Sequence, residues 1–137
     1  MASHTLSDRE YKALAEVRYR LRTFIGFSDE QARTVGLEPR QHQLLLAVRG
    51  LPDELRPTIG TLAERLVVKH HTLVEMIDRL EAIDLVRREA DAHDKRVVLV
   101  RITQRGLAML DRLSLSHRGE LAKTAPALLE ALKRLVG

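Results

Sequence analysis

The order of helical and extended segments in the middle of the chain constrains its fold more than any other feature. Apolar residues recur at helical spacing over residues 59–66 and again over 73–80, with a short connection between them. Residues 85–89 and 97–102 are instead rich in β-branched side chains and enclose a polar stretch at 90–95, which predicts two strands joined as a hairpin. The pattern predicts a helix-turn-helix followed by a β-hairpin.

Longer helical segments precede this region. Ser7 and Glu10 have the spacing of a capping box, so a long helix should begin there and end before Gly36. Its apolar stripe is narrow, which suits packing against another helix, although an ordinary core-facing helix has the same pattern. The stripe consists of Leu14, Val17, Leu21, Phe24 and Ser28. A short second helix should begin at Pro39 and close at Gly50.

Two helices are predicted after the hairpin. Thr103 can cap the first, and Thr124-Ala125-Pro126 is predicted to interrupt it and restart a last helix. Large aliphatic side chains form a stripe on this last helix, and a chain end rarely carries such a stripe unless another surface covers it. They are Leu128, Leu129, Leu132, Leu135 and Val136.

Composition excludes several classes of protein. With 137 residues, 45% of them hydrophobic, the chain can form one domain with a real core. It has no Cys, which excludes disulfide scaffolds, Cys-ligated zinc and thiol redox sensors. No apolar run approaches the roughly twenty residues that span a bilayer, and no signal peptide is recognisable, so we expect a soluble, cytoplasmic protein without a membrane partner. Recognised nucleophile motifs and Gly-rich phosphate loops are absent, so we expect neither an enzyme nor a cofactor.

Four segments share the order and spacing of a known family. They are Thr58 to Leu66, Thr72 to Glu81 with Leu85-Val86, Asp91 to Arg96, and Ile102-Thr103. The Asp-x-Arg formed by Asp94 and Arg96, followed seven residues later by Thr103, is the most specific part. These segments resemble the MarR family of bacterial transcription regulators, and the resemblance runs from about Leu37 to Leu110.

The resemblance implies a mainly α fold with a small β-hairpin: a winged helix-turn-helix flanked by N- and C-terminal dimerisation helices. We expect an N-terminal dimerisation helix at 7–36, a winged helix-turn-helix DNA-binding region at 37–110 and C-terminal dimerisation helices at 111–137, all in one compact domain. The implied protein is a homodimer that binds a two-fold-symmetric operator in double-stranded DNA. It would regulate transcription as a repressor released by a small anionic or phenolic ligand.

The second helix of the helix-turn-helix supplies the candidate base readers, because the first residues of such a helix reach base edges in the major groove. Lys69 and His70 can donate to phosphate or guanine, and Glu75 can accept from a cytosine amino group. A solvated helix start without DNA contact would show the same two adjacent histidines. The candidates on this helix are Lys69, His70, His71, Thr72, Val74, Glu75 and, as a backbone contact or surface ion pair, Arg79.

The hairpin supplies a second candidate contact. Asp94 can hold the Arg96 guanidinium two residues later, and a pre-oriented Arg suits a narrow, electronegative minor groove. The resemblance likewise implies that Arg96 inserts into the minor groove and that Asp94 positions it. Arg88, Lys95 and Arg101 are candidate phosphate contacts. Residues 87–105 contain six basic and three acidic side chains, a net +3 of the chain's formal +4. A surface salt bridge without DNA contact is the alternative.

Three positions depart from the family pattern. Lys69 stands where a Ser or Thr usually caps the recognition helix, Val67 replaces the glycine of the turn, and Asp84 replaces the glycine after the helix. Asp tolerates a left-handed backbone but less well than glycine does. These departures leave DNA binding as the expectation and change the expected base preference.

Members of the family often bind small anionic or phenolic molecules, and this property indicates candidate effector-binding residues. Tyr19, Arg22, Phe27 and His42 are the aromatic, cationic and imidazole side chains that suit such a ligand. His42 with His117 would serve a zinc-responsive regulator, although the histidines lack the i, i+4 spacing of a helical metal site and we expect no metal. The other alternative is a winged-helix protein-interaction module without DNA binding, which Glu75 and the modest net charge would fit.

Overall fold

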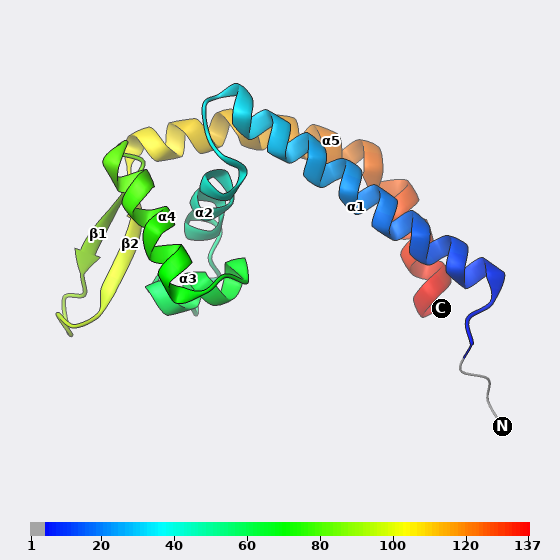
Figure 1. Ribbon diagram of the computed structural model, residues 1–137, viewed down its shortest axis with the longest axis horizontal. Coiled ribbons are helices and arrows are strands. Elements are labelled where there is room, and N and C mark those ends of the chain that lie inside the picture. Colours follow the sequence, from blue (N-terminus) through cyan, green and yellow to red (C-terminus); the bar gives the residue numbers. More distant parts are fainter. Residues whose placement is uncertain (1–4) are drawn as a thin grey trace. The chain divides into compact units, whose positions relative to one another are not determined.

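The structure, a computed structural model, describes residues 5–137, which form five helices and one two-stranded antiparallel sheet (Figure 1). The elements are α1 (Asp8–Thr34), α2 (Pro39–Arg49), α3 (Ile59–Leu66), α4 (His70–Ala82), β1 (Val86–Ala90), β2 (Val98–Ile102) and α5 (Gln104–Val136). This order confirms the predicted mainly α fold with a small β-hairpin. Within the described residues, no helix is long and apolar enough to cross a membrane.

Contacts divide the chain into two compact units. We call residues 32–113 the winged-helix unit, and residues 5–31 together with 114–137 the terminal-helix unit. The long helices α1 and α5 each contribute to both units.

An aliphatic core holds the winged-helix unit together. Every element of the unit contributes at least one buried side chain, so each helix and the hairpin lose apolar surface to the same core. The largest fully buried side chains in it are Leu44, Leu45, Leu62, Leu73, Ile77, Leu80, Leu85, Leu113, Val86 and Val100.

The hairpin is tied to the segment before α3. β1 and β2 are antiparallel, with Val86 opposite Ile102 and Ala90 opposite Val98. The Val100 N–H donates to the Pro57 carbonyl at 2.9 Å, and Thr58 forms an isolated antiparallel bridge with Leu99. The base of the hairpin is therefore fixed against the rest of the unit.

Local capping explains where the helices begin. The Ser7 N–H donates to Glu10 Oε1 at 3.0 Å and the Glu10 N–H to Ser7 Oγ at 3.1 Å, which confirms the predicted capping box. Thr58 Oγ1 accepts from the Thr61 N–H at 3.2 Å and caps α3, and Thr103 Oγ1 accepts from the Gly106 N–H at 3.0 Å, which confirms the predicted cap of α5.

The predicted break at Thr124-Ala125-Pro126 is wrong, because α5 continues through Pro126 to Val136. A proline inside a helix removes one backbone hydrogen bond and crowds the preceding turn. The helix continues because buried residues on both sides of the proline, Thr124 and Ala131, keep both halves packed in the terminal-helix unit.

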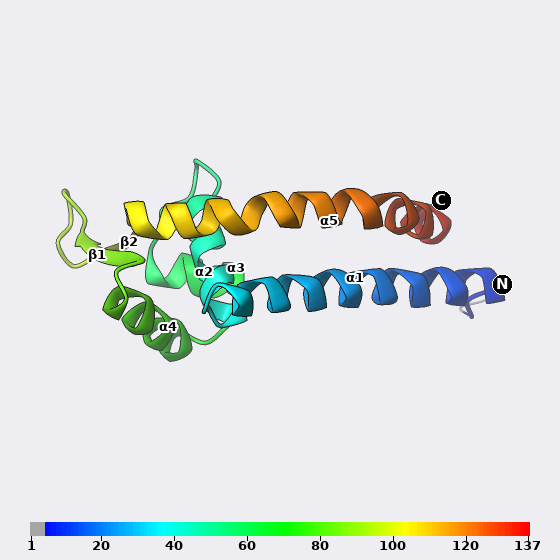
Figure 2. The same cartoon turned by 90° about the horizontal axis from the view of Figure 1, so that it is seen from above.

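In the terminal-helix unit, α1 and α5 lie side by side and antiparallel (Figure 2). His117 on α5 makes a 2.7 Å Nε2–Oγ hydrogen bond with Ser28 on α1, and its ring meets those of Phe24 and Phe27 edge-on. Ala13 is fully buried. Many large apolar side chains of the unit nevertheless remain exposed, namely Leu6, Tyr11, Leu14, Tyr19, Leu21, Ile25, Leu115, Leu121, Leu129, Leu132 and Val136.

Candidate nucleic-acid interface

A left-handed turn connects α3 to α4 and presents the start of α4. Val67 has φ 55° and ψ 48°, so a β-branched residue occupies the conformation that glycine adopts most readily. Lys69 is the N-cap of α4 and makes no side-chain capping hydrogen bond. Asp84, after α4, also has a positive φ of 61°. Val67 and Asp84, which stand where the family has glycine, thus both have positive φ. Lys69, which stands where the family has Ser or Thr, provides no side-chain cap.

One face of α4 is buried in the core and the other carries the sequence-predicted base readers. Leu73, Met76, Ile77 and Leu80 form the buried face. Lys69, His70, His71 and Glu75 are exposed, while Thr72 and Val74 are half-buried. The exposed face therefore gathers hydrogen-bond donors of the first turn beside one carboxylate. Arg79, one turn later, lies with Nη1 3.5 Å from Glu38 Oε2 at the start of α2.

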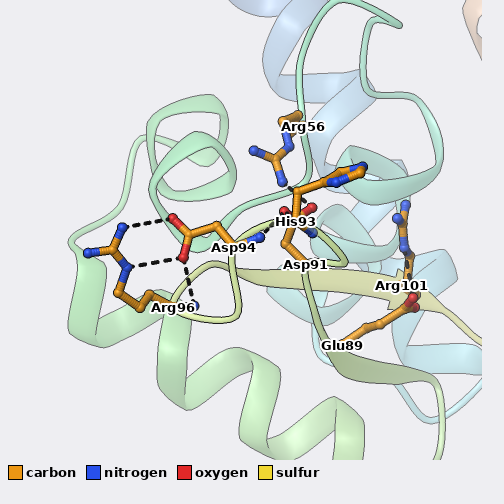
Figure 3. Close-up of polar contacts among 7 residues, drawn as sticks. All are labelled: Arg56, Glu89, Asp91, His93, Asp94, Arg96 and Arg101. Carbon is orange, nitrogen blue, oxygen red and sulfur yellow. Dashed lines mark hydrogen bonds and ion pairs between the residues drawn. The ribbon is translucent and has the colours of Figure 1, made fainter.

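The hairpin loop holds Arg96 in a fixed orientation while leaving it open to solvent (Figure 3). Its Nε donates to Asp94 Oδ1 at 3.0 Å and its Nη2 to Asp94 Oδ2 at 3.2 Å, and its N–H also donates to Asp94 Oδ1 at 3.1 Å. The Arg96 side chain is 91% exposed, and Lys95 beside it is also exposed. A two-point ion pair of this kind restricts the guanidinium without covering it.

Hydrogen bonds to carboxylates set the electrostatics of this loop. The Arg96 guanidinium, followed by the Arg96 backbone N–H, holds the pKa of Asp94 below its usual value. The pKa of Asp91 is also lowered, mainly by the Asp94 backbone N–H and also by the His93 N–H and the Arg56 guanidinium. Both carboxylates are thus held in their charged form.

Two other basic residues of the hairpin have partners within the protein. Arg88 donates from Nη2 to Asp78 and from Nη1 to Glu81, each at 2.5 Å, and its pKa is raised chiefly by the hydrogen bond to Asp78. Arg101 lies 3.5 Å from Glu89 across the hairpin. Arg88 therefore ties β1 to α4, a pairing that a count of charges along the sequence does not reveal.

Two residues of this loop network, Asp91 and Arg56, were not predicted from the sequence. Asp91 Oδ2 accepts from the backbone N–H groups of His93 and Asp94 at 3.1 and 2.9 Å, a local turn that its spacing could have indicated. Arg56 pairs with Asp91 from 35 residues away, so no local pattern points to it.

The candidate effector residues are divided between the two units. Tyr19 is exposed, with the Arg20 guanidinium carbon 5.3 Å from its ring centroid; Arg22 is exposed, and Phe27 packs against His117. These three belong to the terminal-helix unit, whereas His42 is buried in the winged-helix unit.

The zinc alternative requires that other metal-ligating side chains lie near His42 or His117. His117 contacts Ser28 and the two phenylalanine rings of its own unit. Across residues 5–137, no group of three or more His, Cys, Asp or Glu side chains is arranged to hold a metal ion.

The arrangement of α3, α4 and the hairpin defines a winged helix-turn-helix protein. Residues 35–97 match the family model described as "MarR family". The HTH-type transcriptional regulator MhqR of Bacillus subtilis (strain 168) is 25% identical over 95 residues, which cover 69% of this chain and 63% of that protein. The match thus spans less than two thirds of the curated relative.

Solved structures show the same fold. AbsC, a MarR family transcriptional regulator from Streptomyces coelicolor, has a TM-score of 0.74 at 23% identity, over 97% of this chain and 90% of that one. A mutant MarR from E. coli in complex with operator DNA has a TM-score of 0.66 at 23% identity, over 88% of this chain and 91% of that one. The chain is thus similar to MarR family regulators, in sequence over residues 35–97 and in fold.

Proposed function

We propose that this protein is a transcriptional regulator that binds double-stranded DNA sequence-specifically as a homodimer. The observation that carries the proposal is that one unit exposes two sets of basic hydrogen-bond donors to solvent. These are the exposed first turn of α4, with Lys69 and His70, and the exposed Arg96 guanidinium held by Asp94.

Recognition would divide between the grooves. The first turn of α4 enters the major groove, where Lys69, His70 and His71 donate to phosphates or base acceptors and Glu75 accepts from a cytosine amino group. Arg96 enters the adjacent minor groove, whose negative potential attracts a guanidinium most strongly where the groove is narrow. Lys95 adds a phosphate contact.

The homodimer is supported by the exposed apolar side chains of the terminal-helix unit. Leu129 is 57% exposed, and leucines on both helices are also exposed. A monomer rarely leaves so much apolar surface in water, and a second copy of the same unit would cover it. Two DNA-reading units related by a two-fold axis would then read a two-fold-symmetric operator.

We further propose that the protein represses transcription and that a small ligand controls this repression. A dimer seated on an operator represses by excluding other proteins from it, and a small anionic or phenolic ligand would release it. The candidate ligand contacts are Tyr19, Arg22 and Phe27 in the terminal-helix unit and, as a separate candidate, His42 in the winged-helix unit.

The test begins with duplexes that the purified wild-type protein selects from a random DNA pool. Affinity for a selected two-fold-symmetric duplex should fall steeply with salt, because bound phosphates release counterions. Arg96→Ala should weaken binding by about 1–3 kcal/mol. Arg112→Ala, which removes an exposed arginine from α5, serves as the matched control and should change affinity much less.

Three results would contradict the proposal. Binding that is independent of salt would leave no role for phosphate contacts. An Arg96→Ala variant with unchanged affinity would remove the wing from the interface, and a protein that selects no duplex at all would favour a protein-interaction module.

A further inference from the structure

Asp91 is the centre of the hydrogen-bond network that shapes the wing loop. Its carboxylate accepts from the His93 and Asp94 N–H groups, and its own N–H donates to the Val97 carbonyl at 2.9 Å. The Asp91 side chain is only 12% exposed, although it is charged. The turn that it closes leads directly into the Asp94–Arg96 pair.

Arg56 approaches this carboxylate from outside the hairpin. Its Nη2 pairs with Asp91 Oδ1, while the backbone hydrogen bonds of Asp94 and His93 use Oδ2 (Figure 3). Arg56 precedes Pro57, whose carbonyl accepts from Val100 on β2. The arginine therefore projects from a segment that is itself fixed to the hairpin.

We propose that Arg56 is a positioning residue for the wing: acting through Asp91, it holds the loop in the conformation that presents Asp94 and Arg96. The inference rests on the proposed DNA binding and deepens it.

A direct phosphate contact is the competing role for Arg56, since its side chain is 54% exposed. The two roles differ in how they combine with Arg96. Residues that act through one network show non-additive effects, whereas two independent DNA contacts add.

The experiment therefore uses a double-mutant cycle of Arg56→Gln and Arg96→Ala on the duplex selected by the wild-type protein. Arg56→Gln should weaken binding about threefold to tenfold in the wild-type background, and less than about twofold when Arg96 is already Ala. Arg56→Lys, which keeps a charge for Asp91, should recover most of the affinity. The control Arg112→Gln removes the same charge from α5 and should show neither effect.

A second measurement does not depend on DNA. Amide hydrogen exchange of His93 and Asp94 should be faster in Arg56→Gln than in wild type, and close to wild type in Arg56→Lys, with exchange in the α4 core unchanged. Faster exchange in the core as well would indicate general destabilisation and would overturn a specific positioning role.

The remaining outcomes separate this inference from the proposed function. If wild type binds the duplex and Arg56→Gln adds fully to Arg96→Ala, Arg56 is an independent phosphate contact and the inference fails alone. An affinity and a loop exchange rate that are both unchanged in Arg56→Gln also overturn it. If wild type selects no duplex, the proposed function fails, and the exchange measurement still decides whether Arg56 orders the loop.

Discussion

The winged-helix unit and the terminal-helix unit solve the problem of burying apolar surface in different ways. The winged-helix unit encloses Leu44, Leu62 and Ile77 completely within one chain. The terminal-helix unit buries alanines such as Ala13 and Ala131 between its two helix segments and leaves leucines such as Leu129 in solvent. A set of short helices can surround a core, whereas two helices alone have outer faces that only another surface can cover.

The same contrast appears in the backbone. Among residues 5–137, both non-glycine residues with positive φ, Val67 and Asp84, lie in the winged-helix unit. Unfavourable backbone conformations persist where the surrounding packing determines them, and that unit has the core to do so. The winged-helix unit is therefore stabilised by its own core, whereas the terminal-helix unit leaves much of its apolar surface exposed in a single chain.

The largest expected difference between the units comes from truncating one leucine in each. Leu44→Ala should lower the free energy of unfolding by about 2–5 kcal/mol, because it leaves a cavity in the closed core. Leu129→Ala should cost much less in dilute protein, since the side chain is already exposed in a single chain. Urea unfolding measures the first effect, and sedimentation velocity should show Leu129→Ala shifting a dimer toward monomer at micromolar concentration.

Equal effects of the two truncations would contradict the difference between the two units. A wild-type protein that sediments as a monomer at that concentration would show that the exposed leucines need no second copy. An equal loss of stability for both variants in dilute protein would show that Leu129 is buried within one chain.

Alanine substitution of two glycines in α5 should change the free energy of unfolding in opposite directions. A Cβ at Gly106, in the winged-helix unit, would lie 2.1 Å from the Leu85 carbonyl oxygen, so Gly106→Ala should destabilise by about 1–3 kcal/mol. A Cβ at Gly119, in the terminal-helix unit, meets nothing within 4 Å, so Gly119→Ala should stabilise by about 0.5–1 kcal/mol through helix propensity. Thermal and urea unfolding measure both; effects of the same sign would contradict the packing difference.

Removing the backbone strain in the turn before α4 should produce a smaller increase in the free energy of unfolding. Val67 is 89% exposed and left-handed, so Val67→Gly removes little packing and should stabilise the unit by about 1 kcal/mol. Asp84→Gly should gain less, because Asp tolerates this conformation better than a β-branched residue does. A larger gain at Asp84 than at Val67 would show that the strain lies at the other end of α4.

The smallest expected effect is the response of the wing to acid. Because the folded pKa values of Asp91 and Asp94 are lowered, their contribution to stability is present above the ordinary aspartate pKa of about 3.9 and is lost as pH falls through the lowered values. NMR titration of the carboxyl carbons should place both midpoints below that of a free aspartate, and Arg56→Gln should raise the midpoint of Asp91. Midpoints at the ordinary value would contradict the hydrogen-bonded loop.

Much of the fold could be predicted because its determinants are local. The Ser7 and Glu10 capping box, the threonine caps and the change from helical to alternating period depend on residues a few positions apart. The exposed side of α4 could also be predicted, since Leu73 and Ile77 define the buried side by their spacing. The Asp94–Arg96 pair followed from a spacing of two residues.

The sequence by itself thus determined the order of elements through the hairpin, where α1 and α3 begin and which side of α4 is exposed, because each depends on neighbours along the chain. Only the tertiary structure decided that Arg88 is held by Asp78 and Glu81, that Arg56 reaches Asp91, and that α5 continues through Pro126. Ion pairs between distant segments and the tolerance of a proline depend on what packing brings together, and no local pattern contains that information.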